Sequence, residues 1–154
     1  MIVLAVYAPT SPQRLLDVAR LAFSSNVIDI FAVIKPSAMA AQVGVPEVGK
    51  LAYKMGRRLA ILPQIQDLSE VMGVNTIAFL VHDESAYSLE EVLKESSESI
   101  AIVIQGGDTP FTKGDLALGK PVKHSMPEIP PIPAADAALV IEAIMRVKRA
   151  HGPK

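Results

Sequence analysis

Short apolar runs alternate with amphipathic segments along this chain. Uninterrupted runs of β-branched and other apolar residues predict strands that are covered on both faces, because such strands need few polar residues. Apolar positions that recur every three or four residues predict helices. The expected strands cover residues 2–7, 27–34, 59–62, 76–81, 100–104 and 121–123. The expected helices cover residues 12–23, 47–55, 65–72, 89–95 and 135–150.

This alternation predicts an α/β fold, with a mostly parallel sheet and helices on both faces. The 154 residues suffice for one domain with a proper core, and we expect a single domain over residues 1–154. The run Pro127–Pro133 is followed by too little chain to fold alone, so it does not mark a domain boundary.

Local signals mark the ends of several expected helices. Ser11 before Pro12 predicts a capped helix start. Ser88 followed three residues later by Glu91 predicts a capping box. Gly56 is expected to end the second helix, because glycine readily takes the left-handed conformation of a helix end.

Composition narrows the class of protein. Half of the residues are hydrophobic and 20% are charged, which is typical of a globular chain. No cysteine is present, so disulfides and thiolate chemistry are excluded, and a reducing compartment suits the chain. The formal net charge of −1 gives no global attraction to a polyanion. The apolar start is too short for a signal peptide, and no run reaches the length of a membrane span, so we expect a cytoplasmic protein with no membrane partner.

Two loops near the C-terminus stand out as candidate binding segments. The strand that starts near Ser99 stops at Gly106 and Gly107, and the proline-rich stretch from His124 to Pro133 leads into the last helix. Ligands of parallel sheets bind beyond the carboxyl ends of the strands. These loops therefore predict a site built largely from main chain.

Common cofactor and catalytic motifs are missing from the sequence. It has no GxGxxG, no Walker lysine and no GxSxG. Its three histidines, His82, His124 and His151, lie far apart and lack the spacing of metal ligands, so no metal site is expected.

Several short motifs follow one another in a familiar order. Residues Ala8 to Arg20 read Ala-Pro-Thr-Ser-Pro-Gln-Arg-Leu-Leu-Asp-Val-Ala-Arg, and a strand follows Asn26. Later, an apolar strand enters Ile104-Gln-Gly-Gly107, and a short strand enters Ser125-Met-Pro127 before an alanine-rich helix. This order resembles the SpoU-like branch of the SPOUT RNA methyltransferases, and the resemblance spans nearly the whole chain.

The resemblance implies a C-terminal trefoil knot, bound S-adenosylmethionine, a homodimer, and methylation of a tRNA or rRNA nucleotide. It implies a catalytic role for Arg20. Because a guanidinium stays charged, Arg20 is expected to bind phosphate or orient the nucleophile. The implied cofactor-binding residues are Val81, His82, Ile104, Gln105, Gly106, Gly107, Met126, Pro127 and Ile129.

Basic residues suggest where RNA phosphates would lie. Arg14 and Lys35 follow the ends of two expected strands and would extend a phosphate-binding surface. Further candidates form two clusters, each of which is equally compatible with an ordinary charged surface. They are Lys54, Arg57 and Arg58, and then Arg146, Lys148, Arg149 and Lys154.

The chain departs from the family pattern at two places. It has Gln105-Gly-Gly-Asp108 where SpoU enzymes carry a Gly-Asn-Glu-like signature, and Asp136 replaces the asparagine of a Ser-Leu-Asn signature. The leading hypothesis is a methyltransferase that uses S-adenosylmethionine. The alternative is a non-catalytic nucleotide- or RNA-binding module on the same scaffold. A third hypothesis is a hydrolase that holds a divalent metal with Asp83, Glu84 and Asp108.

Overall fold

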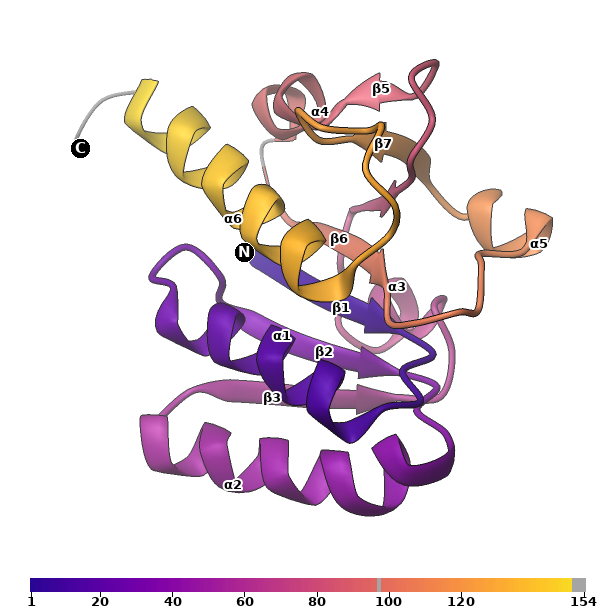
Figure 1. Ribbon diagram of the computed structural model, residues 1–154. Coiled ribbons are helices and arrows are strands. Elements are labelled where there is room, and N and C mark those ends of the chain that lie inside the picture. The colour runs from indigo at the N-terminus through magenta and orange to yellow at the C-terminus, as the bar shows by residue number, and fades with distance from the viewer. Residues whose placement is uncertain (97, 151–154) are drawn as a thin grey trace.

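The computed structural model describes residues 1–96 and 98–150, which form a seven-stranded sheet between layers of helices. All strand pairs are parallel, in the order β3-β2-β1-β6-β4-β7-β5 (Figure 1). The strands are β1 (Ile2–Tyr7), β2 (Ile30–Ile34), β3 (Arg58–Leu62), β4 (Thr76–Leu80), β5 (Tyr87–Ser88), β6 (Ile100–Gln105) and β7 (Lys120–Lys123). The predicted α/β class is confirmed.

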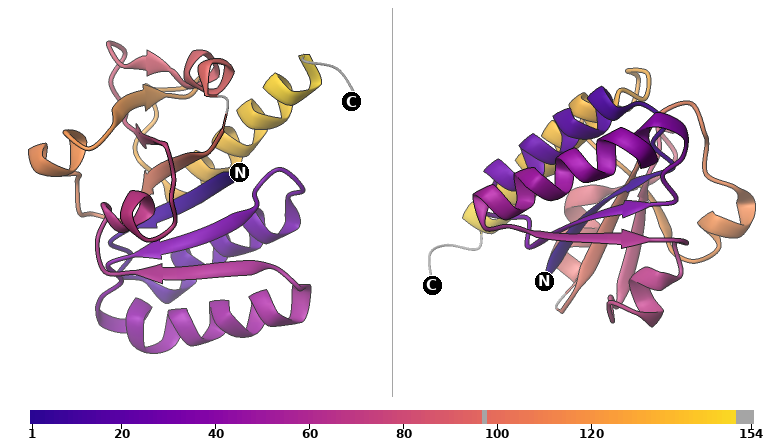
Figure 2. Two further views of the ribbon diagram at one scale, coloured as in Figure 1. Left: turned by 180° about the vertical axis from the view of Figure 1, so that it is seen from behind. Right: turned by 90° about the horizontal axis from the view of Figure 1, so that it is seen from below.

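Helices cover both faces of the sheet. The long helices α1, α2 and α6 lie on one face, and the short α3 lies on the other (Figure 2). The helices are α1 (Pro12–Ser24), α2 (Val45–Met55), α3 (Asp67–Glu70), α4 (Leu89–Glu95), α5 (Lys113–Leu116) and α6 (Pro133–Ala150), with a π-helix η1 (Ala40–Gly44) before α2. No helix among the described residues is long and apolar enough to cross a membrane.

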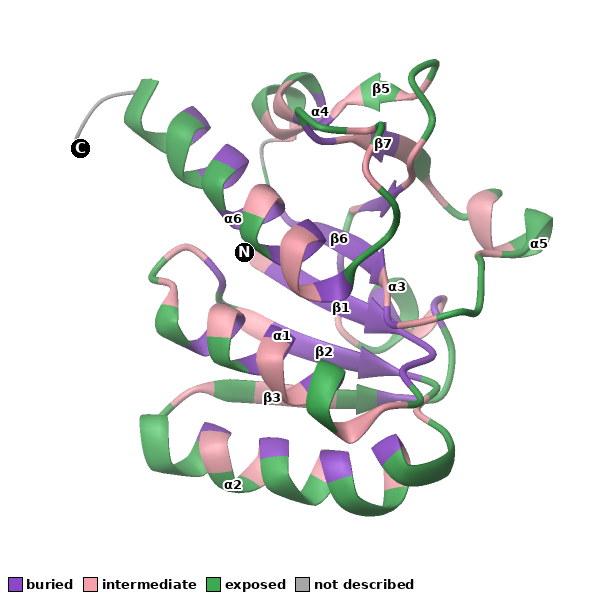
Figure 3. Ribbon diagram, in the orientation of Figure 1, coloured by how far each residue is buried: buried purple, intermediate pink, exposed green. Residues whose placement is uncertain are grey.

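The central strands are buried on both sides, which explains their uninterrupted apolar runs. Leu4 and Ile102 belong to the apolar cluster under the long helices, whereas Val3 and Val103 belong to the cluster on the α3 side. Successive residues of a strand point to opposite faces, so both faces of β1 and β6 need apolar side chains. Figure 3 shows this buried centre and the exposed outer surfaces of α2 and α6.

Several element boundaries differ from the sequence prediction. The second strand begins at Ile30 instead of Val27, because its pairing with β1 starts where Val3 lies beside Ile30. Just before it, Asp29 Oδ2 accepts a hydrogen bond from the Ile2 N–H. The helix expected at 47–55 begins two residues earlier, directly after the π-helix. Neither the π-helix, β5 nor α5 was predicted, because such short elements carry too little periodicity to be recognised.

The two predicted N-caps have different outcomes. Ser11 caps α1 as expected, since its hydroxyl accepts a hydrogen bond from the Arg14 N–H at 3.3 Å. The capping box predicted for Ser88 and Glu91 is wrong. The Ser88 hydroxyl makes no cap bond and donates instead to the side chain of Glu90.

Sheet order determines where loops from distant parts of the chain meet. Strand β4 lies between β6 and β7, so Phe79 pairs with Val103 on one side and with Pro121 on the other. The segments after these three strands therefore leave the sheet side by side. Threading of the chain into a trefoil knot stays a prediction from the resemblance.

Candidate functional site

Three of the predicted cofactor-binding segments begin at one edge of the sheet. Val81 follows β4 and donates its N–H to the Val122 carbonyl of β7 at 2.8 Å. Gln105 ends the adjacent strand β6, and Met126 comes three residues after the end of β7. The carboxyl ends of parallel strands are where ligands bind in such sheets, so this edge is the candidate site.

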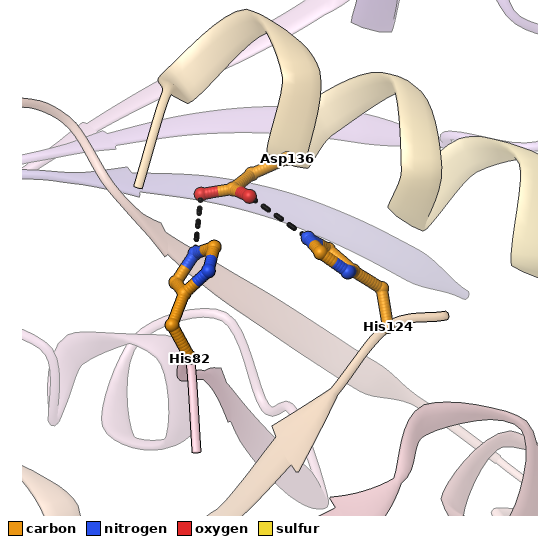
Figure 4. A group of neighbouring side chains, drawn as sticks. All are labelled: His82, His124 and Asp136. Carbon is orange, nitrogen blue, oxygen red and sulfur yellow. Dashed lines mark hydrogen bonds and ion pairs between the residues drawn. The ribbon is translucent and has the colours of Figure 1, made fainter. Parts of the chain in front are cut away.

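A buried carboxylate joins two of these segments. Asp136 lies in the first turn of α6 and is 1% exposed. One of its oxygens bonds His82 Nε2 at 3.1 Å and the other bonds His124 Nε2 at 2.9 Å (Figure 4). We name this arrangement the histidine clamp. Sequence distance suggested that the histidines lie apart, but the fold brings His82 and His124 to one carboxylate.

Hydrogen bonding fixes the tautomer of His124. The Met126 N–H donates to His124 Nδ1 at 3.1 Å, so Nδ1 must present a lone pair. A neutral His124 then carries its proton on Nε2 and donates it to Asp136. The clamp is thus a directed chain of hydrogen bonds from the last loop into α6.

The clamp residues are also close enough to one another to hold a metal ion. A metal at His124 Nε2 would require Nδ1 to carry the proton and donate it, as metal-bound histidines usually do. Here Nδ1 faces the N–H of Met126 instead, and the two histidines bond different carboxylate oxygens. This donor pattern fits a hydrogen-bonded clamp and does not fit a metal centre.

One ring nitrogen of the clamp has no partner. Among the buried side-chain nitrogen and oxygen atoms of residues 1–96 and 98–150, His82 Nδ1 is the one that makes no hydrogen bond. In the neutral tautomer that directs Nε2–H at Asp136, His82 carries a lone pair on Nδ1. A buried acceptor without a donor is unfavourable, so this position suits a molecule that brings an N–H or O–H group.

The paired glycines after β6 play different roles. Gly106 donates its N–H to the Tyr7 carbonyl at 2.8 Å, and a Cβ at this position would lie 2.9 Å from Pro9 Cα. Gly106 therefore packs against the loop between β1 and α1, and its amide does not remain free for a ligand as the sequence suggested. A Cβ on Gly107 would meet only the Thr10 hydroxyl, at 3.7 Å, so the backbone there is open.

The acidic residues expected in a metal-dependent hydrolase do not gather. Among the described residues, Asp83, Glu84 and Asp108 form no group close enough to share a metal ion. Asp83 instead accepts hydrogen bonds from the Ser85 N–H and hydroxyl, both at 2.9 Å, and these bonds lower the pKa of its carboxyl group. Asp83 therefore belongs to an ordinary turn over residues 83–86, which the Ala86 N–H closes by donating to the Asp83 carbonyl.

The predicted catalytic residue lies away from the clamp. Arg20 is exposed on α1, pairs with Asp17 at 3.6 Å, and lines a groove of about 200 Å³ with Lys50 and Lys54 of α2. In the described part of the chain, no hydrogen bond or ion pair joins Arg20 to the predicted cofactor segments. The groove that Arg20 lines is formed by α1 and α2 and contains none of the predicted cofactor residues.

The predicted RNA-binding residues fall into two groups. Arg14 and Lys35 are exposed beyond the carboxyl ends of β1 and β2. Arg58 begins β3 and thus lies at the opposite end of the sheet, where Arg57 donates from Nη2 to the Ser25 and Ile28 carbonyls. Lys54 is exposed near the C-terminal end of α2.

The second basic cluster is partly committed to ion pairs. Arg146 forms ion pairs with Glu142 of its own helix and with Glu90 of α4, so its guanidinium group already has two acidic partners. Lys148 and Arg149 are exposed, and the predicted member Lys154 lies outside the described residues, as does His151.

Two cavities compete as ligand sites. A cavity of about 650 Å³ lies at the amino ends of the strands, lined in part by Ile2, Ile100 and Ile144. A smaller cavity of about 420 Å³ borders the clamp through His124, with Pro127 among its lining residues. We favour the smaller one, because it lies at the carboxyl edge of the sheet and the buried His124 of the clamp lines it. Of the predicted cofactor residues, Pro127 is among its lining residues.

Solved structures with a similar fold are described as methyltransferases. A structure described for the 2-OH methylation of C/U34 on tRNA has a TM-score of 0.72 at 18% identity and covers 97% of both chains. The SpoU methyltransferase AviRb from Streptomyces viridochromogenes, solved with AdoMet, has a TM-score of 0.67 at 13% identity. That match covers 97% of this chain and 61% of AviRb. The architecture is thus the SPOUT methyltransferase fold.

Sequence comparison identifies the family. The model of a family described as "RecB-family nuclease (DUF2122)" matches residues 38–142, more than half of the chain, and the protein belongs to this family. A protein of Aeropyrum pernix is 29% identical over 138 residues, which cover 89% of this chain and 88% of the relative. The name of that relative, ApeKORF2002P, marks it as a proposed type II restriction enzyme. Family description and fold therefore point to different chemistry.

Proposed function

We propose that this protein binds S-adenosylmethionine at the carboxyl edge of β6, β4 and β7 and transfers its methyl group to a tRNA or rRNA nucleotide. The observation that carries the proposal is the convergence of the three predicted cofactor segments at this edge, in the fold of RNA methyltransferases. The proposal gives this chain the function of the SpoU-like methyltransferases, whose fold it shares.

The residues at this edge fit the cofactor. His82 Nδ1 is an acceptor without a donor, and an adenosyl group carries amino and hydroxyl donors. Met126 is 43% exposed on the last loop and supplies an apolar wall, with the half-buried Ile129 in the same turn. Val81 and the open backbone at Gly107 lie beyond the ends of β4 and β6 and are the further residues that we assign to the cofactor.

When bound, S-adenosylmethionine supplies a methyl group on a positively charged sulfur. The nucleophile of the RNA forms the new bond to carbon as the carbon–sulfur bond breaks, and the proton of the nucleophile leaves to solvent or a base. Arg20 orients that nucleophile or its phosphate, because a guanidinium does not serve as a free base near neutral pH. Since Arg20 lies away from the clamp of its own chain, we propose a homodimer in which it serves the site of the partner subunit.

Calorimetry and a transfer assay test this proposal together. Arg20→Ala is expected to keep the affinity for S-adenosylmethionine within about twofold and to reduce methyl transfer to a tRNA and rRNA pool at least about 100-fold. Lys50→Ala, in the same groove, is the matched control and should retain transfer. Absence of S-adenosylmethionine binding by the wild type would refute the proposal, and unchanged transfer by Arg20→Ala would refute its assigned role.

A metal-dependent nuclease is the second candidate, because the family description and the name of the relative point to nucleases. Such chemistry needs carboxylates that share a divalent ion. In the described residues, the group near enough to hold an ion contains one carboxylate, and that carboxylate bonds two histidines. Cleavage of plasmid DNA or RNA in Mg²⁺ would favour the nuclease. Binding of S-adenosylmethionine without transfer would favour a non-catalytic module.

A further inference from the structure

We infer that Asp136 is a positioning residue. Through the histidine clamp, it sets the conformation of the loop between β7 and α6 and thereby the affinity of that loop for an adenosyl ligand. This inference rests on the proposed function and deepens it, since it names the residue that shapes the binding loop. Asp136 itself need not touch the ligand.

The first arm of the clamp reaches the predicted cofactor residues directly. Asp136 holds the His124 ring by Nε2, and the other ring nitrogen accepts the Met126 N–H. The Met126 carbonyl then accepts the Ile129 N–H at 3.2 Å, which closes a turn over residues 126–129. A continuous path of hydrogen bonds therefore runs from α6 to both ends of this turn.

The second arm holds the segment after β4. Asp136 bonds His82, and the rings of His82 and His124 lie edge to face with their centroids 5.4 Å apart. One carboxylate thus fixes the separation of two loops that come from different parts of the chain (Figure 4). The backbone of Asp136 is itself anchored, because its N–H donates to the Ile132 carbonyl at 2.9 Å.

Burial of this carboxylate is hard to explain by packing alone. Removal of a charged group from water is costly, and an apolar side chain of similar size would dock α6 without that cost. What the clamp provides is a single relative position of α6 and the two loops, because two fixed oxygens accept hydrogen bonds from two fixed donors. His124 converts this arrangement into loop conformation, since both of its nitrogens are bonded.

Two isosteric substitutions of His124 separate the roles of the two ring nitrogens. The amide of His124→Gln extends far enough to donate to Asp136 in place of Nε2, but it offers no acceptor to Met126. The shorter amide of His124→Asn offers an oxygen to Met126 in place of Nδ1, but it leaves Asp136 without that donor. The first variant keeps the anchor of α6, and the second keeps the anchor of the loop.

The inference predicts that these variants separate the affinity for the ligand from the stability of the fold. His124→Gln should bind S-adenosylmethionine about tenfold more weakly, which is the loss of one hydrogen bond, with a melting temperature close to wild type. His124→Asn should lower the melting temperature clearly and also weaken binding about tenfold, because it breaks the link between Asp136 and the loop. Asp136→Asn should lower both the affinity for S-adenosylmethionine and the melting temperature. A purely structural role would instead move affinity and melting temperature together in all three variants, and that result would overturn the inference.

Nitrogen NMR of the free protein supplies a readout that needs no ligand. The expected spectrum has His124 protonated at Nε2 and unprotonated at Nδ1, and protonation at Nδ1 would overturn the clamp. If the wild type binds no S-adenosylmethionine, the proposed function and this inference both fail. If it binds and His124→Gln keeps wild-type affinity, the inference alone fails.

Discussion

Asp136 accepts a hydrogen bond from His124 at 2.9 Å across the loop that precedes α6, and both side chains are buried. The same carboxylate reaches His82, 54 residues earlier in the chain. This relationship links the first turn of the last helix to the edge of the sheet where ligands of α/β proteins bind. It also gives the candidate site a rigid polar centre under an exposed apolar loop.

Addition of a zinc ion tests whether the clamp holds protons or a metal. We expect the melting temperature of the wild type to be unchanged by EDTA and by stoichiometric Zn²⁺, because the Met126 N–H occupies the ring nitrogen that a metal-bound histidine would use as a donor. Asp136→Asn is the control. Stabilisation by Zn²⁺ that disappears in this variant would show a metal centre instead.

Gly106→Ala is expected to destabilise the protein by about 1–3 kcal/mol, the usual range for overpacking of a filled interior. The new Cβ would lie 2.7 Å from the Tyr7 carbonyl oxygen and 2.9 Å from Pro9 Cα, and backbone atoms move less readily than side chains. Gly107→Ala is the matched control and should change stability little, because its Cβ meets only Thr10. Urea unfolding measures the free energy of unfolding of both variants. Equal losses of stability would contradict the packing role of Gly106.

Arg57→Ala is expected to cost about 1.5–3 kcal/mol of stability, the range for hydrogen bonds of charged groups. The guanidinium of Arg57 bonds the Ser25 and Ile28 carbonyls and so ties the loop before β2 to the start of β3. Arg58→Ala, one residue later and exposed, should change stability by less than about 0.5 kcal/mol. If both residues instead bind RNA phosphates, the two variants will weaken RNA binding equally and leave the urea midpoint unchanged.

Ser85→Ala is expected to raise the pKa of Asp83 toward its ordinary range without restoring it fully. The larger cause of the lowered pKa is the N–H of residue 85, which the substitution leaves in place, and the smaller cause is the Ser85 hydroxyl. Because the folded pKa is depressed, the contribution of Asp83 to stability is present above its ordinary pKa and is lost as the pH falls through the lowered value. Carboxyl NMR titration measures the shift, and an unchanged pKa would contradict the hydroxyl contribution.

Local pattern sufficed to predict most of the fold. Apolar runs located the central strands, since strands buried on both faces leave a continuous signal, and helix α4 was predicted with its observed bounds. The Ser11 cap was predictable because a cap involves neighbours within a few residues. The carboxyl-edge rule, combined with the resemblance, located the candidate site at the segments after β4, β6 and β7.

The contents of that site were decided by tertiary structure. The sequence separated His82, His124 and Asp136 and carried no spacing that joins them, because no helix or turn relates positions so far apart. They meet because β4 and β7 are neighbours in the sheet and α6 begins above their ends. Likewise, only the approach of the loop between β1 and α1 assigns Gly106 to packing. Sequence therefore determined the elements and the edge of the sheet, whereas strand order determined which side chains share that edge.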